Sequence, residues 1–361
     1  MRVGVVAERR AGERRVALVP DAVGPLLQAG LDVVVESGAG LTAFASDDAY
    51  REAGAQVLDG DVLADSDVVL TVSPLTADQA ALLRPGTITL GFLPVGAQTE
   101  LLAVLRERKV LAFSMERVPR ISRAQSMDAL SSQALVAGYR AALVAAERLP
   151  RFFPLFMTAA GTVAPARVLV LGAGVAGLQA IATARRLGAV VEAYDVRPAS
   201  ADEVRSMGAT FIDLGLESLE GAGGYAREMA EERAERQREL LTPYVGASDA
   251  VITTAAVPGR AAPLLVTTTM VEAMRPGSVL VDLAAESGGN CELSNAGEVV
   301  EHQGVQVWGA RDVPSSMPVH ASQLYSRNVA SLLLLMTADG QVLPDFDDEI
   351  VAAACVTRED S

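Results

Sequence analysis

The sequence contains few of the residues that hold small secreted proteins or zinc domains together. Its only cysteines are Cys291 and Cys355, and no CxxC pair occurs. A disulfide framework and a structural zinc site are therefore not expected, and the composition fits a reducing cytosol. We predict that no metal is bound and that both cysteines act as small, inert hydrophobic residues.

Positive charge and long apolar runs are also scarce. The formal net charge is −15, and such a surface repels nucleic-acid phosphates and anionic lipid, so neither is expected as a partner. The apolar run SLLLLM at 331–336 is far shorter than the roughly 20 residues that cross a bilayer. The first residues, MRVGVVAERR, carry charges where a signal peptide has its apolar core. We expect this chain to be soluble by itself.

Short Val-rich runs alternate with helical patterns along most of the chain. Half of the residues are hydrophobic and only 4% are aromatic, which is typical of parallel strands covered on both faces by Ala/Leu helices. The runs that we predict to be strands are 3–8, 32–37, 66–72, 86–92 and 109–115, followed by 166–173, 190–196, 209–214, 249–255, 278–284 and 305–310. Strands that alternate with helices predict βαβ crossovers.

The two series of strands predict an α/β fold with two Rossmann-like, doubly wound parallel-sheet domains. The first is expected to comprise residues 1–125 plus 315–361, because the amphipathic helix predicted at 321–336 should pack back on it. The second is expected to cover residues 130–312. We interpret the Pro- and Gly-punctuated stretch 152–166 as a connector, and the end of the chain as an extension.

The segment 166–198 carries the most specific motif. A predicted strand leads directly into a glycine-rich turn, and a helical pattern follows; the turn consists of Gly172, Ala173, Gly174, Val175, Ala176 and Gly177. In a dinucleotide-binding turn the first glycine allows the tight bend, and the second lets the backbone approach a pyrophosphate. The third lets the helix pack closely on the strand. The N-terminus of the helix then offers N–H groups and a positive dipole end to the phosphates.

An acidic residue follows at the spacing of roughly 20 residues that this motif requires. Asp195 ends the next predicted strand, and Val196 and Arg197 come directly after it. A carboxylate here accepts hydrogen bonds from the adenosine ribose hydroxyls and repels a 2′-phosphate, which favours NAD over NADP. Arg197 leaves an alternative open, since an arginine beside the acid can accommodate a 2′-phosphate. We predict an NAD(H) site in the cleft between the two domains.

A polar segment, RISRAQSMDALSSQ at 120–133, separates two apolar stretches. Taken by itself, this segment is explained by helix capping: Asp128 or Ser126 can cap the helix that follows, and Ser122-x-x-Gln125 matches a capping box. The other interpretation is a group of polar side chains directed at a ligand. Both interpretations can hold at once.

Further motifs extend the dinucleotide fingerprint to a family resemblance. GERRVALVP (12–20), VPGRAAP (257–263) and MRPGSVLVDLAAESGGN (274–290) together resemble two related families over almost the whole chain. These are alanine dehydrogenase and the NAD(H)-binding component, domain I, of proton-translocating NAD(P) transhydrogenase.

Missing acid/base residues separate the two families. Alanine dehydrogenases have a lysine after the third strand region and a histidine after the fourth, whereas this chain has Thr71 and Ser73 in the first place and Pro94 in the second. The only lysine and the two histidines lie elsewhere, at Lys109, His302 and His320. Amino-acid oxidation needs a general acid/base, so we predict that this chemistry is lost. We expect Arg15 to be a structural ion-pair partner; Glu286 is as much a candidate for pairing with it as for contacting a ligand.

Transhydrogenation does not require those side chains. A hydride passes directly from one nicotinamide to another, so the protein has only to position the two rings. The stretches RISRAQSMDALSSQ, GGYAREM and CVTRED are similar to motifs of the transhydrogenase family. The resemblance therefore implies an NAD(H)-binding transhydrogenase subunit, an oxidoreductase and translocase component.

The same resemblance implies roles for individual residues. Arg120, Gln125 and Asp128 would lie beside the nicotinamide and Ser131 at the same end of the cofactor, with Gln125 directed towards the ribose of NADP(H) on a partner. The turn at 172–177 would hold the pyrophosphate and Asp195 the adenosine ribose. Thr254 and Ala255 would line the pocket. Tyr225 would close over the nucleotide from a mobile loop, although 215–222 departs from the family and an isolated tyrosine is more often a surface aromatic.

The partners follow from the resemblance as well. We expect a homodimer that acts with an NADP(H)-binding subunit and a membrane-spanning proton-channel subunit, and that lies in the cytoplasm against the inner side of the cell membrane. Two other functions stay open: an alanine dehydrogenase-like oxidoreductase with relocated catalytic groups, and a non-catalytic NAD-binding regulator.

Overall fold

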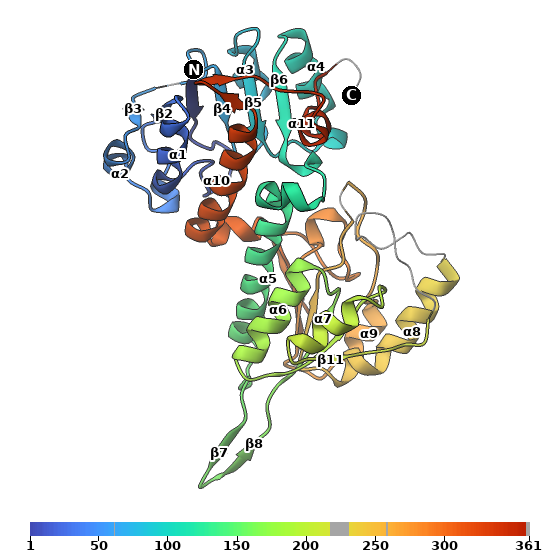
Figure 1. Ribbon diagram of the computed structural model, residues 1–361. Coiled ribbons are helices and arrows are strands. Elements are labelled where there is room, and N and C mark those ends of the chain that lie inside the picture. Colours follow the sequence, from blue (N-terminus) through green and yellow to red (C-terminus); the bar gives the residue numbers. More distant parts are fainter. Residues whose placement is uncertain (61, 217–230, 258, 359–361) are drawn as a thin grey trace. The chain divides into compact units, whose positions relative to one another are not determined.

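The chain forms two compact units, each built around a largely parallel sheet (Figure 1). The computed structural model describes residues 1–60, 62–216, 231–257 and 259–358. Unit 1 comprises Met1–Gln133 with Pro314–Ser361, and unit 2 comprises Ala134–Val313. The α/β class with two Rossmann-like, doubly wound sheets is confirmed. The predicted domain limits, residues 1–125 plus 315–361 and residues 130–312, stay a prediction.

The sheet of unit 1 has six parallel strands in the order β3-β2-β1-β4-β5-β6. They are β1 (Arg2–Val5), β2 (Asp32–Glu36), β3 (Gln56–Leu58), β4 (Val68–Leu70), β5 (Ile88–Gly91) and β6 (Leu111–Ser114). Five of them coincide with predicted runs. The sixth, β3, lies outside those runs because it is a three-residue edge strand with largely exposed side chains, too short to show a hydrophobic pattern.

Helices cover both faces of this sheet. Unit 1 contains α1 (Val23–Gln28), α2 (Asp47–Glu52), α3 (Ala77–Ala81), α4 (Thr99–Glu107), α10 (Pro318–Leu335), α11 (Glu349–Ala354) and the 3-10 helices η1 (Pro20–Ala22), η2 (Leu41–Ala43), η3 (Val95–Ala97), η4 (Met115–Arg117) and η5 (Ser122–Met127). A further 3-10 segment, η8, spans Val313–Ser316, and a small hairpin joins β16 (Thr337–Ala338) to β17 (Gln341–Val342). Side chains alternate across each strand, so one face packs on α1 and α10 and the other on α3 and α4.

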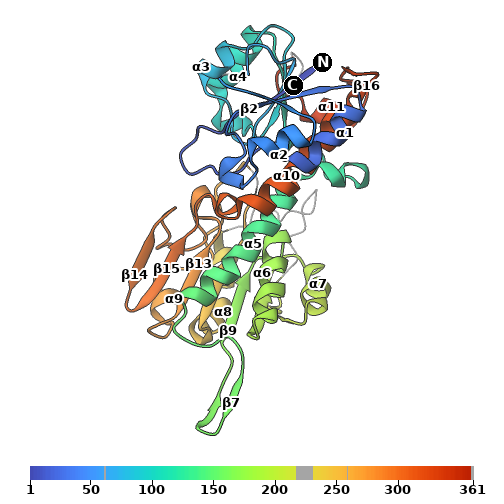
Figure 2. The ribbon, with the colours of Figure 1, turned by 90° about the vertical axis from the view of Figure 1, so that its left-hand side faces the viewer.

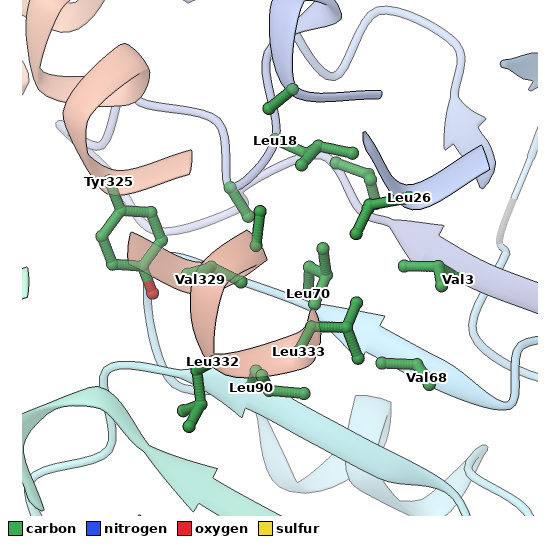
Figure 3. Close-up of a cluster of buried hydrophobic side chains, with 14 of the residues drawn as sticks. Val3, Leu18, Leu26, Val68, Leu70, Leu90, Tyr325, Val329, Leu332 and Leu333 are labelled. Atoms are coloured by element: carbon green, nitrogen blue, oxygen red, sulfur yellow. The ribbon is translucent and has the colours of Figure 1, made fainter. Parts of the chain in front are cut away.

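The core of unit 1 depends on α10, far away in the sequence. Its Tyr325, Val329, Leu332 and Leu333 are fully buried and lie among side chains of the strands and of the first 30 residues, as Figure 3 shows. The last described residues also pack on this unit, because Cys355 forms a β-bridge to Phe113 and the N–H of Val356 donates to the carbonyl of Ala112. The stretch interpreted as an extension is therefore part of the fold.

The sheet of unit 2 has seven strands in the order β11-β10-β9-β12-β13-β15-β14. They are β9 (Arg167–Leu171), β10 (Val190–Tyr194), β11 (Thr210–Phe211), β12 (Ala250–Thr253), β13 (Val279–Asp282), β14 (Val299–His302) and β15 (Val305–Gly309). The edge strand β14 is antiparallel to β15, so this sheet is mixed where an all-parallel one was expected. The two strands join through Gln303 and Gly304, both with positive φ, as a tight hairpin turn requires.

In unit 2 as well, successive side chains of a strand pack on opposite faces of the sheet. Val168 and Val170 of β9 pack on the face covered by α5 and α6, whereas Leu169 and Leu171 pack on the face covered by α8 and α9; Figure 2 shows α5 and α6 side by side. The helices are α5 (Ala129–Arg148, which begins in unit 1), α6 (Val175–Arg186), α7 (Ser200–Ser206), α8 (Glu231–Ala247), α9 (Thr268–Glu272) and the 3-10 helix η7 (Ala285–Ser287). The predicted connector at 152–166 contains an exposed hairpin, β7 (Phe156–Thr158) with β8 (Gly161–Val163).

Within the described part of the chain, no helix has both the length and the hydropathy that crossing a bilayer requires.

Candidate functional site

The glycine-rich turn lies between β9 and α6, where the strand order of unit 2 reverses. Gly172 has a φ of +103°, a left-handed conformation that favours glycine. A Cβ atom there would lie 2.7 Å from the hydroxyl oxygen of Thr254, and a Cβ atom at Gly177 would overlap the carbonyl oxygen of Gly172. Both glycines are therefore required by the packing of the turn itself.

Gly174 has a different reason to be glycine. It is the N-cap of α6, and no atom of the described residues lies within 4 Å of the position that its Cβ would occupy. The open space borders the first turn of a 12-residue helix, whose N–H groups and dipole attract anions. Gly174 and Val175 are exposed, whereas Ala176 packs against α5 at Gly138, where a Cβ would overlap the Ala176 carbonyl oxygen. The turn thus leaves an open cradle beside the helix N-terminus, of the kind that an anion such as a pyrophosphate can approach.

Asp195 follows β10 and folds back onto this turn. Its Oδ2 accepts a hydrogen bond from the N–H of Ala173 at 2.7 Å. Arg197 donates to the same carboxylate from its backbone N–H and its Nε to Oδ1 and from Nη2 to Oδ2, at 2.8–2.9 Å. Four donors occupy the roughly four lone-pair positions of a carboxylate, so ribose hydroxyls would have to displace the Arg197 side chain to reach Asp195. Val196 packs into the core beside α8 and α9.

The loop after β12 lies beside the glycine-rich turn, and the pocket-lining roles of Thr254 and Ala255 stay a prediction. The Thr254 hydroxyl donates to the Gly172 carbonyl at 3.0 Å. Asn290 holds Ala255 from both sides, since its Oδ1 accepts from the Ala255 N–H and its Nδ2 donates to the Ala255 carbonyl. Asp282, fully buried at the end of β13, accepts from the backbone N–H groups of Asn290 and Cys291.

Asn290 and Asp282 were not singled out from the sequence. Their function in the fold is visible only through contacts between loops that follow different strands, and the sequence offers a weak signal, an acid at a strand end and the GGN that follows. Cys291 is buried, and burial raises the pKa of its thiol to about 12, which agrees with an inert cysteine.

The polar segment at 120–133 belongs to unit 1. Of its four predicted site residues, three lie close together: Arg120, Asp128 and Ser131. Asp128 precedes α5, and its Oδ1 accepts from the Ser131 N–H at 2.8 Å while its Oδ2 accepts from the Ser131 hydroxyl at 2.6 Å. The Arg120 Nε lies 4.0 Å from Asp128 Oδ2. Asp128 is therefore a helix cap, one of the two interpretations of this segment. It remains partly exposed, as does Ser131, whereas Arg120 is more exposed.

The capping box predicted at Ser122 and Gln125 does not form. Ser122 lies inside η5, whose N-cap is Ile121, and no cap hydrogen bond from a side chain is made there by the described residues. Gln125 lies within η5, just before the N-cap residue Asp128, and its side chain is exposed. Tyr225 lies outside the described residues, so its role stays a prediction.

Arg15 is an ion-pair partner, as expected, but its partner is Glu13 and not Glu286. Its Nε and Nη2 donate to the two Glu13 oxygens at 2.7 Å, and its Nη1 donates to Gln133 at 2.9 Å. Burial raises the pKa of Glu13, but the hydrogen bonds and charge of Arg15 outweigh this and lower it to about 2. Glu286 instead accepts from the backbone N–H of Asp312.

A second, partly buried glutamate lies close to this pair. Glu8 follows β1, and its carboxylate accepts from the N–H groups of Val72 and Ser73 in the loop after β4. Burial raises the Glu8 pKa to about 7, against the lowering by those two N–H groups, and the charge of Glu13 adds to the rise. The places of the alanine dehydrogenase lysine and histidine contain the buried Thr71 and Ser73 and the turn residue Pro94.

Comparison with known proteins agrees with this arrangement. Family models described as "Alanine dehydrogenase/PNT, N-terminal domain" and "Alanine dehydrogenase/PNT, C-terminal domain" match residues 4–137 and 141–361. The chain is 46% identical to an NAD(P) transhydrogenase subunit alpha protein of Rhodospirillum rubrum, over 99% of this chain and 97% of that protein. It is 30% identical to alanine dehydrogenase of Bacillus subtilis, over 88% of this chain and 81% of that protein.

A solved structure is similar over the same length. The crystal structure of transhydrogenase from Sinorhizobium meliloti superposes with a TM-score of 0.90 at 42% identity, over 99% of this chain and 98% of that one. The predicted resemblance is confirmed, and the chain belongs to the alanine dehydrogenase/PNT family.

Proposed function

We propose that this chain is the NAD(H)-binding subunit of a proton-translocating transhydrogenase. In this proposal the chain binds NAD(H), a partner subunit presents NADP(H), and a membrane-spanning subunit couples the transfer to proton movement. Similarity over the full length of a transhydrogenase subunit supports the assignment, and the open space beside Gly174 at the N-terminus of α6 supports a dinucleotide site there.

The observation that carries the proposal is that the guanidinium group of Arg15 is already bound by side chains of the protein. In an amino-acid dehydrogenase a cation must hold the substrate carboxylate and a general acid/base must move its proton. Here Glu13 and Gln133 engage all three guanidinium nitrogens of a buried Arg15. Thr71, Ser73 and Pro94 offer no group that titrates as a lysine or histidine does. The glycine-rich turn at 172–177, by contrast, has the residues that a dinucleotide site would need.

The chain's own residues would then bind and orient. When bound, NAD(H) supplies the hydride at the C4 position of its nicotinamide. The N–H groups at the start of α6 would hold the pyrophosphate, while Asp195 would accept from the adenosine ribose after exchanging Arg197 for the ribose hydroxyls. Thr254 and Ala255 would line the pocket on a backbone held by Asn290.

The segment 120–131 would orient the nicotinamide end. Asp128 is held by two hydrogen bonds to Ser131, so its carboxylate has a fixed direction, and Arg120 lies beside it. Such side chains need no proton exchange; they restrict the ring to orientations that allow transfer, an effect that contributes much of the rate in positioned reactions. Gln125, exposed on η5, would reach the NADP(H) side.

The assembly belongs to the proposal as well. We infer a homodimer that joins an NADP(H)-binding subunit and lies on the cytoplasmic side of the membrane through that partner. The high negative charge of the chain disfavours direct binding to anionic lipid, so the attachment would come from protein contacts.

Mixing purified subunits tests the function. The chain, NADH, NADP⁺ and the NADP(H)-binding subunit should together form NADPH, whereas omission of either protein should abolish the reaction. Formation of NADH from alanine and NAD⁺ by the chain alone would favour a self-contained dehydrogenase. Tight NADH binding without transfer, under saturating conditions with the partner, would favour a non-catalytic regulator.

A further inference from the structure

A buried amide on α10 contacts the polar segment from the opposite end of the sequence. Asn328 is 7% exposed and lies on a helix whose other buried side chains, such as Val329, Leu332 and Leu333, build the apolar core of unit 1. A buried polar group that only filled space would destabilise this core. The contacts of Asn328 show where its two polar atoms are used.

Asn328 holds the polar segment at two points. Its Nδ2 donates to the Ser126 carbonyl at 2.8 Å, and its Oδ1 accepts from the Ser132 hydroxyl at 2.7 Å. Ser126 precedes Asp128 by two residues and Ser132 follows Ser131 directly. One amide therefore fixes both sides of the stretch that carries Asp128 and Ser131.

The backbone hydrogen bond that joins η5 to Asp128 is long, in contrast to the short bonds between Asp128 and Ser131. The 3-10 helix η5 has the poorer bond geometry of that helix type, and the bond from the Asp128 N–H to the Gln125 carbonyl is 3.4 Å long. Gln133 adds a second tie between α5 and α10, because its Nε2 donates to the Ala321 carbonyl at 3.0 Å. α10 thus holds the backbone on both sides of the Asp128–Ser131 pair, whose own two hydrogen bonds set the direction of the carboxylate.

We propose that Asn328 is a positioning residue for hydride transfer. It acts through the backbone of Ser126 and the first turn of α5, and it holds Asp128 and Ser131 at the nicotinamide end without contacting the cofactor itself. This inference rests on the proposed function. An amide suits the position, since it offers a donor and an acceptor on two separate atoms, one for each contact.

The same helix supplies a matched control. Ser326, two residues away and fully buried, accepts a hydrogen bond from the Val19 N–H at 3.0 Å. Ser326→Ala and Asn328→Ala each remove buried hydrogen bonding from α10, but only Asn328 contacts the segment 126–132. Both variants should lower the melting temperature, and only Asn328→Ala should impair transfer.

The test compares transfer by the full chain with the NADP(H)-binding subunit at saturating NADH. Asn328→Ala should lower the rate by about 10- to 100-fold, the size of effect that a displaced positioning group produces. Its Kd for NADH should stay close to that of the unmodified chain, because the pyrophosphate and adenosine contacts lie elsewhere. The kinetic isotope effect with NADH deuterated at C4 should change for Asn328→Ala and not for Ser326→Ala.

A second variant keeps the test decisive if Asn328→Ala folds poorly. Asn328→Asp keeps the shape and the acceptor for Ser132 but places an oxygen against the Ser126 carbonyl, so it should also slow transfer. Transfer at the unmodified rate by a folded Asn328→Asp or Asn328→Ala protein would overturn the inference, as would an equal loss in Ser326→Ala. Absence of transfer by the unmodified chain would instead refute the proposed function.

Discussion

Asp195 and Arg197 form a closed pair that has to open for ribose recognition. Arg197 supplies three of the four donors around the carboxylate, and it is also the only feature of this motif that suits a 2′-phosphate. Removal of the arginine side chain should expose the full negative charge of Asp195. We therefore expect the choice between NADH and NADPH to depend on these two residues, whose charges act in opposite directions.

Arg197→Ala should increase the preference for NADH over NADPH. The variant loses a cation that can attract a 2′-phosphate and leaves a carboxylate that repels it. Asp195→Asn should do the reverse and weaken NADH binding by about tenfold or more, the scale of one hydrogen bond to a charged group. Titration of each variant with both nucleotides measures these ratios. Tighter NADPH binding by Arg197→Ala would contradict this role of the pair.

Glu8 should give the stability of the protein a distinctive pH dependence. Its pKa is raised in the folded state from 4.5 to about 7, so its contribution to stability is fully present below about pH 4.5 and is lost as the pH rises through 7. Glu8→Gln should remove this slope, which amounts to about 3 kcal/mol at most. Denaturant unfolding between pH 5 and 8 measures it, with the α2 variant Glu52→Gln as control. Parallel curves for Glu8→Gln and the unmodified chain would refute the prediction.

Asp128 can be tested separately as a cap and as a cofactor residue. Asp128→Asn keeps an oxygen for the Ser131 N–H, so the stability should change little, whereas Asp128→Ala should lose about 1 kcal/mol of helix capping. Both variants should slow hydride transfer severely while NADH binding through the adenosine end persists. Melting curves, NADH titration and transfer rates separate the two roles. Full transfer by Asp128→Asn would leave capping as the only role.

Residue types could be predicted from the sequence better than their partners. Arg15 was expected to be structural, and Glu286 was one candidate for its partner, but Glu13, two residues away, binds the guanidinium instead. Likewise, either Asp128 or Ser126 was expected to cap the helix that follows. Asp128 is the cap because η5 contains Ser126 and ends just before Asp128. Local spacing identifies candidates, but the choice between them depends on where loops from distant parts of the chain meet.

At the scale of elements, the glycines of the glycine-rich turn differ in role: one is required for packing, and another leaves space for a ligand. Gly177 is needed by the protein, since a methyl group there would overlap the Gly172 carbonyl, whereas a methyl group at Gly174 would point into open space. The backbone at Gly174 is extended, with φ −77° and ψ −169°, so alanine can adopt it. A methyl group at Gly177 would therefore disturb the packing of the turn, whereas one at Gly174 would only occupy the open space beside it.

Gly174→Ala should leave the unfolding free energy within about 1 kcal/mol of the unmodified value and should strongly weaken NADH binding. Gly177→Ala should lower both, because overpacking against backbone costs about 1–3 kcal/mol or more. Thermal unfolding and NADH titration on the same preparations distinguish them. Normal NADH affinity in Gly174→Ala would mean that the pyrophosphate does not approach this backbone.

Long, buried elements were predictable and short or exposed ones were not. Val-rich strands such as β2 and β9 carry their own hydrophobic signal, and the helix at 321–336 matched α10 closely. The edge strands β3 and β14 and the hairpin β7–β8 have exposed side chains or few residues, so pairing with a neighbour, not hydrophobicity, determines them.

On the scale of the whole molecule, the two sheets reverse strand order at corresponding places. In unit 2 the crevice between β9 and β12 contains the open glycine-rich cradle. In unit 1 the crevice between β1 and β4 is filled by the protein's own side chains, since Glu8 and Glu13 there contact Ser73 and Arg15. Sites in open α/β sheets form at such points, and here only one of the two has the open cradle that a nucleotide needs.

The proposed function requires that the chain takes part in direct hydride transfer between two nucleotides and not in proton transfer on an amino acid. The most direct measurement uses NADH in which both hydrogens at C4 are deuterium, the NADP(H)-binding subunit and NADP⁺ in ordinary water. Direct transfer predicts that the deuterium appears at C4 of the NADPH formed, without dilution by solvent protons. NADPH free of deuterium, or no transfer with both proteins saturated, would contradict it.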